Sequence, residues 1–169
     1  MREKKKKGRI PMAENKTNVM RILEQHKIPY TPHEYPHGKE AVDGVHVAEL
    51  LGQDVKQVFK TLVARGKSGS IYVFVIPVAE ELNLKKAAKA VGEKAMEMIH
   101  VKELLGLTGY VRGGCSPVGL KKPYPVTLHE SANDIPTIIV SAGKIGYQIE
   151  LAPVDLIALV QAKTADLIS

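Results

Sequence analysis

Hydrophobic positions along the chain repeat with two different spacings, which predicts short helices mixed with short strands. Four apolar residues between positions 19 and 23 fall on one helical face behind Thr17, a residue type that caps helix starts. This opening helix is expected to end near residue 27, before Pro29. Further helices are expected at 47–51, which stops at Gly52, at 84–91, which lies between Asn83 and Gly92, at 101–105, and at 153–168.

Strands are predicted where apolar residues alternate or form short continuous runs. The run 28–35 contains Pro29 and Pro32, which restricts it to an edge strand or an extended arm. The runs 55–64 and 71–78 surround a turn at 66–69 and are expected to pair as a hairpin. Later strands are expected at 126–128, 137–140 and 147–151, with a turn at 143–146. Strands and helices without regular alternation predict an α+β domain on a largely antiparallel or mixed sheet.

Composition narrows the class of protein. A chain of 169 residues with 44% hydrophobic residues has the material for one compact domain. No run approaches the roughly 18 apolar residues of a membrane span, and no short apolar segment follows the basic N-terminus as in a signal peptide. The single cysteine, Cys115, excludes an internal disulfide and cannot alone build a sulfur-rich metal site. We expect a cytoplasmic protein.

The net charge of +6 is concentrated at the N-terminus, where the first nine residues hold six basic residues and one acid. Met12 begins a stretch that would serve as an ordinary protein start. We therefore interpret residues 1–11 as a basic extension or a cloning remnant, and 12–169 as a single domain. A solvated, disordered tail is the expected state of the extension, and an electrostatic grip on RNA phosphates is the alternative.

Lys60 is unusual because it lies in a strand whose two faces both look apolar. Alternation places it on the side of Val58 and Leu62. Its stem either extends so that the ammonium reaches water, or it lines a cleft and points at a ligand. In a partly dry cleft the ammonium would attract a carboxylate, a phosphate or a developing oxyanion.

A glycine-rich segment at 108–120 is expected to be an ordered loop. Gly113 and Gly114 permit backbone conformations that turn successive amides toward one point, and such a nest binds negatively charged oxygen. Pro117 stiffens the exit of the loop, and Ser116 adds a hydroxyl. The loop is interpreted either as a structural turn or as an oxyanion pocket that also holds a terminal ribose.

Other reactive side chains give weaker signals. Cys115 has no neighbouring histidine or helix start that would ionise its thiol, so we interpret it as buried filler rather than a nucleophile. His33 and His37 share an extended segment without an obvious third ligand, and no metal site is predicted there. Ser141 follows a predicted strand and precedes a glycine turn, which suits either a strand end or a hydrogen-bonding group at a cleft edge.

Five motifs, taken in order, resemble the YbaK/EbsC family, which is similar to the editing domain inserted in bacterial prolyl-tRNA synthetases. The resemblance covers residue 15 to the C-terminus. It implies a compact α+β fold with a mixed, barrel-like sheet flanked by helices. The motifs are Val58-Phe59-Lys60-Thr61-Leu62, Pro77-Val78-Ala79 with Leu84-Lys85-Lys86-Ala87-Ala88, Thr108-Gly109-Tyr110, Gly113-Gly114-Cys115-Ser116-Pro117-Val118-Gly119 and Val140-Ser141-Ala142-Gly143-Lys144.

The resemblance also implies a function and a site. Members are free-standing deacylases of misacylated tRNA, notably cysteine attached to tRNA for proline, and the cleft holds the 3′ adenosine with its esterified amino acid. The catalytic residues implied are Lys60, Gly114 and Ser141, and the substrate-binding residues are Tyr35, Gly113, Ser116, Pro117 and Gln148.

The chemistry implied by the resemblance needs no cofactor and no enzyme nucleophile. The thiol of the substrate cysteine attacks its own ester carbonyl, displaces the tRNA and leaves as a cyclic thiolactone. One departure concerns Gln148, because several relatives carry an aspartate there. Preference for another small amino acid is therefore an alternative.

Two other functions remain open at this point, a non-catalytic module that binds aminoacyl-tRNA or a nucleotide, and a thiol-dependent hydrolase that uses Cys115. The expected partners are the tRNA 3′ end and prolyl-tRNA synthetase, with no membrane. The nearly neutral body offers no long basic track for an acceptor stem, so a partner would supply the choice of tRNA.

Overall fold

A computed structural model describes residues 16–169 of the chain. The opening helix has the predicted start, because the Thr17 hydroxyl accepts a hydrogen bond of 3.2 Å from the amide of Met20. The predicted signals at Asn83, Gly52 and Gly92 also mark helix ends. The helices are α2 (Asn18–Gln25), α3 (Gly44–Leu51), α4 (Leu84–Val91), α5 (Val101–Thr108) and α6 (Pro153–Val160), with short 3-10 turns η2 (Val55–Gln57) and η3 (Glu130–Asp134).

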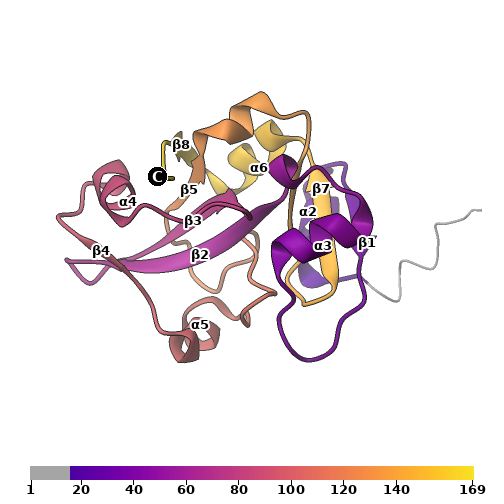
Figure 1. Ribbon diagram of the computed structural model, residues 1–169, viewed down its shortest axis with the longest axis horizontal. Coiled ribbons are helices and arrows are strands. Elements are labelled where there is room, and N and C mark those ends of the chain that lie inside the picture. The colour runs from indigo at the N-terminus through magenta and orange to yellow at the C-terminus, as the bar shows by residue number, and fades with distance from the viewer. Residues whose placement is uncertain (1–15) are drawn as a thin grey trace, which may run out of the picture.

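The strands form two sheets rather than one. The larger sheet has the order β4-β2-β3-β5-β8, and the smaller has the order β1-β7-β6 (Figure 1). The predicted hairpin is the antiparallel pair β2 and β3, and the proline-bearing first strand lies at an edge, as predicted. The strands are β1 (Thr31–Glu34), β2 (Phe59–Gly66), β3 (Ile71–Pro77), β4 (Met96–Met98), β5 (Val126–His129), β6 (Ile138–Ser141), β7 (Tyr147–Leu151) and β8 (Lys163–Ala165).

The predicted α+β class with a mixed sheet is confirmed, but the sheet does not close into a barrel. Strand β5 pairs in parallel with β3 and β8, whereas the other strand pairs are antiparallel. A single parallel bridge between Val58 and Ile139 joins the two sheets, at the start of β2 and within β6. Beyond this bridge the two strands diverge into separate sheets.

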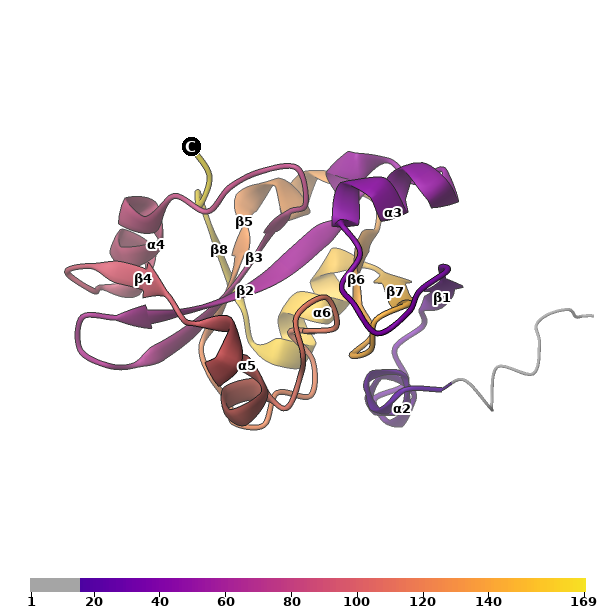
Figure 2. The same cartoon turned by 60° about the horizontal axis from the view of Figure 1, so that its bottom comes forward.

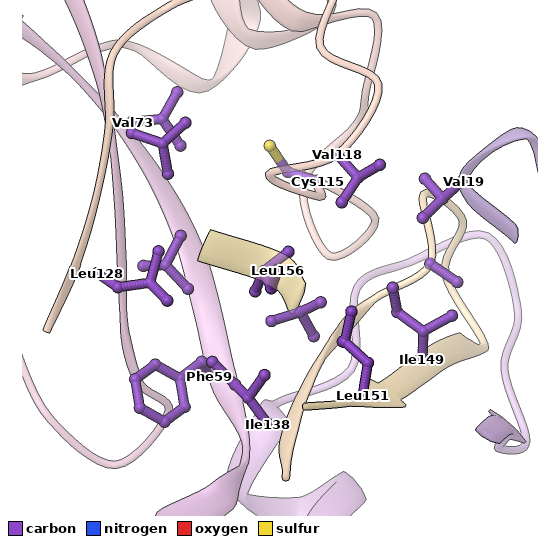
Figure 3. Packing of buried hydrophobic residues seen from close by; sticks show 14 of the residues in the cluster. Val19, Phe59, Val73, Cys115, Val118, Leu128, Ile138, Ile149, Leu151 and Leu156 are labelled. Carbon is purple, nitrogen blue, oxygen red and sulfur yellow. The ribbon is translucent and has the colours of Figure 1, made fainter. Parts of the chain in front are cut away.

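The main apolar core lies between the two sheets and is covered by α2, α6 and the glycine-rich loop (Figure 3). Its members include Phe59 and Val73 from the larger sheet and Ile138 and Leu151 from the smaller one. The opposite face of the larger sheet packs against α4. Helix α3 packs near the bridge, at the other end of the molecule from α4 (Figure 2).

Several predicted boundaries were wrong. The final helix ends at Val160 rather than 168, because Gln161 adopts a left-handed conformation (φ 54°) and residues 163–165 pair with β5 as β8. Residues 55–57 are a 3-10 turn rather than the start of a strand, capped by the Asp54 carboxylate, which accepts from the Lys56 amide. Strand β4 was not predicted. The basic segment 1–11 lies outside the described residues.

Candidate functional site

Lys60 on β2 and Ser141 on β6 lie at equivalent positions along their strands, where the two sheets separate. Val58 and Ile139 are bridged in parallel, and both pack against Ala48 of α3. Lys60 and Ser141 each lie two residues further along in the same direction. Because side chains alternate along a strand, both residues share the face that α3 covers in part.

The Lys60 side chain is half-buried and is flanked by apolar neighbours. Its register partner on β3 is Ile76, which is fully buried. Within residues 16–169 the ammonium makes neither a hydrogen bond nor an ion pair. A cation in such surroundings, without a protein counter-ion, is suited to bind an anionic or polarised oxygen from a ligand.

The glycine-rich loop is ordered, as predicted, and its central residues are buried. Residues 114–118 are all buried, and Cys115 and Val118 belong to the main core (Figure 3). Gly113 has φ of 85°, and a Cβ there would lie 2.6 Å from that of Ala41. A Cβ on Gly114 would lie 3.1 Å from the amide nitrogen of Ile145. The loop therefore packs against the turn that follows Ser141, and larger residues would push the two apart.

Two consecutive amides of this loop have no protein acceptor. The amide of Gly114 donates to the carbonyl of Val111 at 3.0 Å, and that of Val118 donates to the Ser116 hydroxyl at 3.2 Å. In the part of the chain that the structure describes, the amides of Cys115 and Ser116 donate to no protein group. Buried amides are normally paired, so these two are candidates for binding a ligand oxygen.

The hydroxyl predicted to bind substrate at Ser116 is used inside the loop. The residue is fully buried, and its oxygen accepts from the amide of Val118. Pro117 is buried beside it. Ser116 therefore helps to hold the loop, while its own amide stays available.

Tyr110 connects the loop to the turn after Ser141, and sequence reasoning gave it no role. Its hydroxyl donates to the carbonyl of Val118 and lies beside Gly119, and its ring edge lies beside Gly143. Burial, together with the neighbouring Cys115, raises the pKa of Tyr110 to about 12, so the phenol stays a donor. The tyrosine in the motif Thr108-Gly109-Tyr110 was the available signal.

Tyr35 contacts the same turn at Gly146. The residue is 6% exposed, and its amide donates to the carbonyl of Gly146 at 2.9 Å. Its ring meets that of His37 edge to face, and His37 meets Tyr147 in the same way, with centroids 6.3 and 5.5 Å apart. The turn after Ser141 thus contacts both these aromatic residues and the glycine-rich loop.

Gln148 lies directly opposite Ser141 on β7 and is 6% exposed. Its side-chain carbonyl accepts a hydrogen bond of 2.8 Å from the amide Nε2 of Gln53, which follows α3. The Oε1 atom of Gln53 is buried and has no partner among the described residues. Sequence reasoning missed Gln53, because nothing in its local pattern distinguishes it from a polar loop residue.

A second polar group lies on the same face of β7, two residues beyond Gln148. Glu150 accepts from the Thr137 hydroxyl and contacts Nε2 of His33 at 2.7 Å, and Gln57 donates to Thr137. Although burial acts to raise the pKa of Glu150, the hydrogen bonds from Thr137 and His33 hold it below its usual value. We call the polar side chains between α3 and the smaller sheet the polar seam: His33, Gln53, Gln57, Thr137, Gln148 and Glu150.

Cys115 is buried, as predicted, with 7% of its surface exposed. Burial raises the pKa of its thiol to about 12, although a hydrogen bond with Thr108 acts in the opposite direction. A thiol in this state is almost wholly protonated near neutral pH and is a poor nucleophile.

The fold also contains a shallow cavity of about 370 Å³ that none of the predicted residues lines. It lies beside the turn between β2 and β3, and its walls include Tyr72, Lys122 and Tyr124. The predicted residues Lys60, Ser141 and Gln148 lie instead at the junction of the two sheets. No cluster of three or more metal-ligating side chains occurs within residues 16–169, and none of the helices there has the length and apolar character to cross a membrane.

Comparison with known proteins decides the family. Residues 39–159 match the aminoacyl-tRNA editing domain family. A protein named as the Cys-tRNA(Pro)/Cys-tRNA(Cys) deacylase EbsC of Enterococcus faecalis is 48% identical over 155 residues, which cover 92% of this chain and 94% of that protein. The chain belongs to the aminoacyl-tRNA editing domain family. The family and the enzyme class predicted from the sequence are thereby confirmed.

Two further comparisons connect this editing domain with proline. A proline–tRNA ligase of Thermosipho africanus is 33% identical over 76 residues, which cover 45% of this chain and 13% of the ligase. A crystal structure described as a trans-editing enzyme for prolyl-tRNA synthetase has a TM-score of 0.77 and 29% identity, and covers 95% of this chain and 98% of that one. The editing domain fold thus occurs both inside a ligase and as a separate protein.

Proposed function

We propose that this protein removes a wrongly attached amino acid, cysteine foremost, from the 3′ end of tRNA for proline. The observation that carries the proposal is the Lys60 ammonium, which has no partner among residues 16–169 and lies level with Ser141 where the sheets separate. The turn after Ser141 packs against a loop with two free amides. The 48% identical relative from Enterococcus faecalis is named as a Cys-tRNA(Pro)/Cys-tRNA(Cys) deacylase.

The proposed roles follow from the type of each group. Lys60 contacts the terminal nucleotide or the ester oxygen, and the amides of Cys115 and Ser116 bind the oxyanion that forms when the ester carbonyl is attacked. Preorganised donors of this kind contribute roughly 3 kcal/mol each to a transition state. Gly114 allows the close approach of loop and turn, and Ser141, Gln148 and Tyr35 line the side of the amino acid.

The attacking group in this proposal is the thiol of the substrate cysteine. Its sulfur bonds to the ester carbonyl carbon and releases its proton, and the bond to the tRNA 3′ oxygen breaks as that oxygen takes up a proton. The products are a cyclic thiolactone and free tRNA. Holding the thiol and carbonyl in a near-attack arrangement contributes on the order of 7 kcal/mol. The buried, protonated Cys115 is consistent with a protein that supplies no nucleophile.

The decisive experiment incubates the purified protein with Cys-tRNA(Pro) and with its S-methyl-cysteinyl counterpart, which has no free thiol. We expect rapid release of the first ester, a thiolactone among the products, and little release of the second. Equal release of both esters would contradict the thiol mechanism. Tight binding without any release above buffer would favour the binding module, and faster release of Ala-tRNA(Pro) would favour the alternative amino-acid preference.

Choice of tRNA is proposed to come from a partner, prolyl-tRNA synthetase. The support is the nearly neutral body of the chain and the ligase that carries a similar segment. Adding the synthetase to a mixture of Cys-tRNA(Pro) and Cys-tRNA(Cys) is expected to raise the preference for the first. An unchanged ratio would contradict this part of the proposal.

A further inference from the structure

The side-chain amide of Gln53 is held firmly at one end and lacks a partner at the other. Its Nε2 donates to the carbonyl of Gln148 at 2.8 Å, while its Oε1 is buried without a hydrogen bond to any described residue. Leaving a buried acceptor unpaired costs about 1 to 3 kcal/mol. A persistent orphan of this kind calls for an explanation, and a ligand that supplies the missing donor is one.

The position of Gln53 relates this orphan to the candidate site. Gln148 is the register partner of Ser141, and Ser141 is level with Lys60 across the sheet junction. Gln53 follows Gly52, the left-handed residue that ends α3, and this places its side chain over Gln148. The orphan carbonyl therefore borders the side of the site that lies away from Lys60.

The electrostatics of this corner favour a cationic donor. An aminoacyl ester carries its ester oxygens on one side of the α-carbon and an ammonium group on another. The Lys60 ammonium attracts the oxygens and repels the substrate ammonium. The carboxylate of Glu150 lies on the same face of β7 as Gln148, two residues along.

We propose that the side-chain carbonyl of Gln53 accepts a hydrogen bond from the α-ammonium of the substrate amino acid, with Gln148 holding the amide in place. This proposal rests on the proposed function and deepens it. The side-chain carbonyl of Gln53, held in place by Gln148, recognises the ammonium as a hydrogen-bond donor. Gln53 is thus a specificity-determining residue contributed by the end of α3.

The test compares Cys-tRNA(Pro) with 3-mercaptopropionyl-tRNA(Pro), which keeps the thiol and lacks only the ammonium. Gln53→Met preserves the length of the side chain and removes its carbonyl. We expect the variant to lose about 10- to 100-fold in kcat/KM with Cys-tRNA(Pro), as for a hydrogen bond to a charged group, and to be unchanged with the deamino substrate. Equal losses with both substrates would mean that Gln53 only supports the fold, and no loss would also overturn the proposal.

Two variants sharpen the result. Gln53→Glu keeps an acceptor, and the Gln148 amide can turn to donate to it. The Gln53→Glu variant should retain activity with Cys-tRNA(Pro). If Gln53 instead donated a hydrogen bond to the substrate, this variant would lose activity. Gln57→Met is the matched control, because the Gln57 amide already donates to Thr137 at 2.9 Å. It should change kcat/KM by the same factor with both substrates, because it acts through the stability of the fold and not on the ammonium.

A binding measurement separates this proposal from the proposed function. The probe is 3′-deoxy-3′-(cysteinylamino)adenosine, whose amide is not hydrolysed, with the 3-mercaptopropionyl amide as its partner. Gln53→Met should weaken the first by about tenfold and leave the second unchanged. This pattern without ester hydrolysis by the natural sequence would reject the deacylase and keep the ammonium contact. Ester hydrolysis by the natural sequence without this binding pattern would keep the deacylase and reject the ammonium contact.

Discussion

The two sheets differ in what they place on their faces, and the difference separates structure from chemistry. Strand β3 in the larger sheet is buried from Val73 to Ile76 and contacts an apolar cluster on each face. Strand β7 in the smaller sheet directs Ile149 and Leu151 into the core and presents Gln148 and Glu150 to the polar seam. The larger sheet is a scaffold, and the face of the smaller sheet beside the junction supplies the polar groups.

The largest expected effect is on the scaffold. Phe74→Ala removes a fully buried ring from the middle of the larger sheet and should lower the free energy of unfolding by about 3 to 5 kcal/mol. Urea unfolding followed by circular dichroism measures this. Ser141→Ala, at the end of β6, is the matched comparison and should cost under about 1 kcal/mol. Similar losses in the two variants would contradict the division between the sheets.

The next largest effect is expected at the sheet junction, where a substitution should reduce catalysis without reducing stability. Lys60→Met keeps the apolar stem and removes an ammonium that makes no ion pair within residues 16–169. We expect kcat/KM for Cys-tRNA(Pro) to fall about 100- to 1000-fold, as on loss of one transition-state donor, with an unchanged melting temperature. Lys56→Met, an exposed lysine in η2, is the control and should keep full activity. A normal kcat/KM in Lys60→Met would mean that Lys60 takes no part in the site.

A smaller effect is expected where Tyr110 joins the glycine-rich loop to the turn after Ser141. Tyr110→Phe removes the hydroxyl that donates to the Val118 carbonyl and should cost about 1 kcal/mol of stability. Because that bond positions the free amides, kcat should fall by a similar factor, roughly fivefold. Tyr124→Phe loses an equivalent bond to Leu107 outside the site and should affect stability alone. A larger loss of kcat in Tyr124→Phe than in Tyr110→Phe would contradict the positioning role.

The smallest expected effect is at Cys115. Its pKa of about 12 means that the thiolate is scarce below that pH and forms only as the pH rises toward it. Cys115→Ala should therefore leave kcat/KM unchanged, and the rate profile between pH 6 and pH 9 should superimpose on that of the natural sequence. If iodoacetamide alkylated Cys115 rapidly and activity was lost, the result would favour the thiol-dependent hydrolase.

The sequence predicted those elements whose signals are local. Thr17 and Asn83 accept from the helix amides that the capping pattern requires, and the β2–β3 hairpin follows from two apolar runs around a glycine turn. The apolar run 153–168 gave no local sign of its break, because β8 exists only through its pairing with β5. Strand β4 likewise depends on β2, which it pairs with over three residues.

The sequence supplied candidate site residues through its motifs, whereas contacts between residues distant in sequence left no pattern in it. Lys60, Gly114 and Ser141 were named from the order of their motifs, and their roles remain predictions. Gln53 lies 95 residues from Gln148, so the hydrogen bond between them leaves no pattern in the chain. Ser116 was predicted to bind substrate, and in the structure its hydroxyl oxygen accepts from the amide of Val118, two residues further on. Whether a hydroxyl binds a neighbouring amide or a ligand depends on how the loop is buried, which a single sequence does not reveal.

The most direct measurement is an NMR titration of the full chain with 3′-deoxy-3′-(cysteinylamino)adenosine, the uncleavable analogue of the substrate end. We predict that the largest amide shifts fall at Cys115, Ser116 and Ser141, with the Lys60 side chain also responding and β3 unaffected. Shifts confined to the cavity lined by Tyr72, Lys122 and Tyr124, with the sheet junction unchanged, would contradict the account.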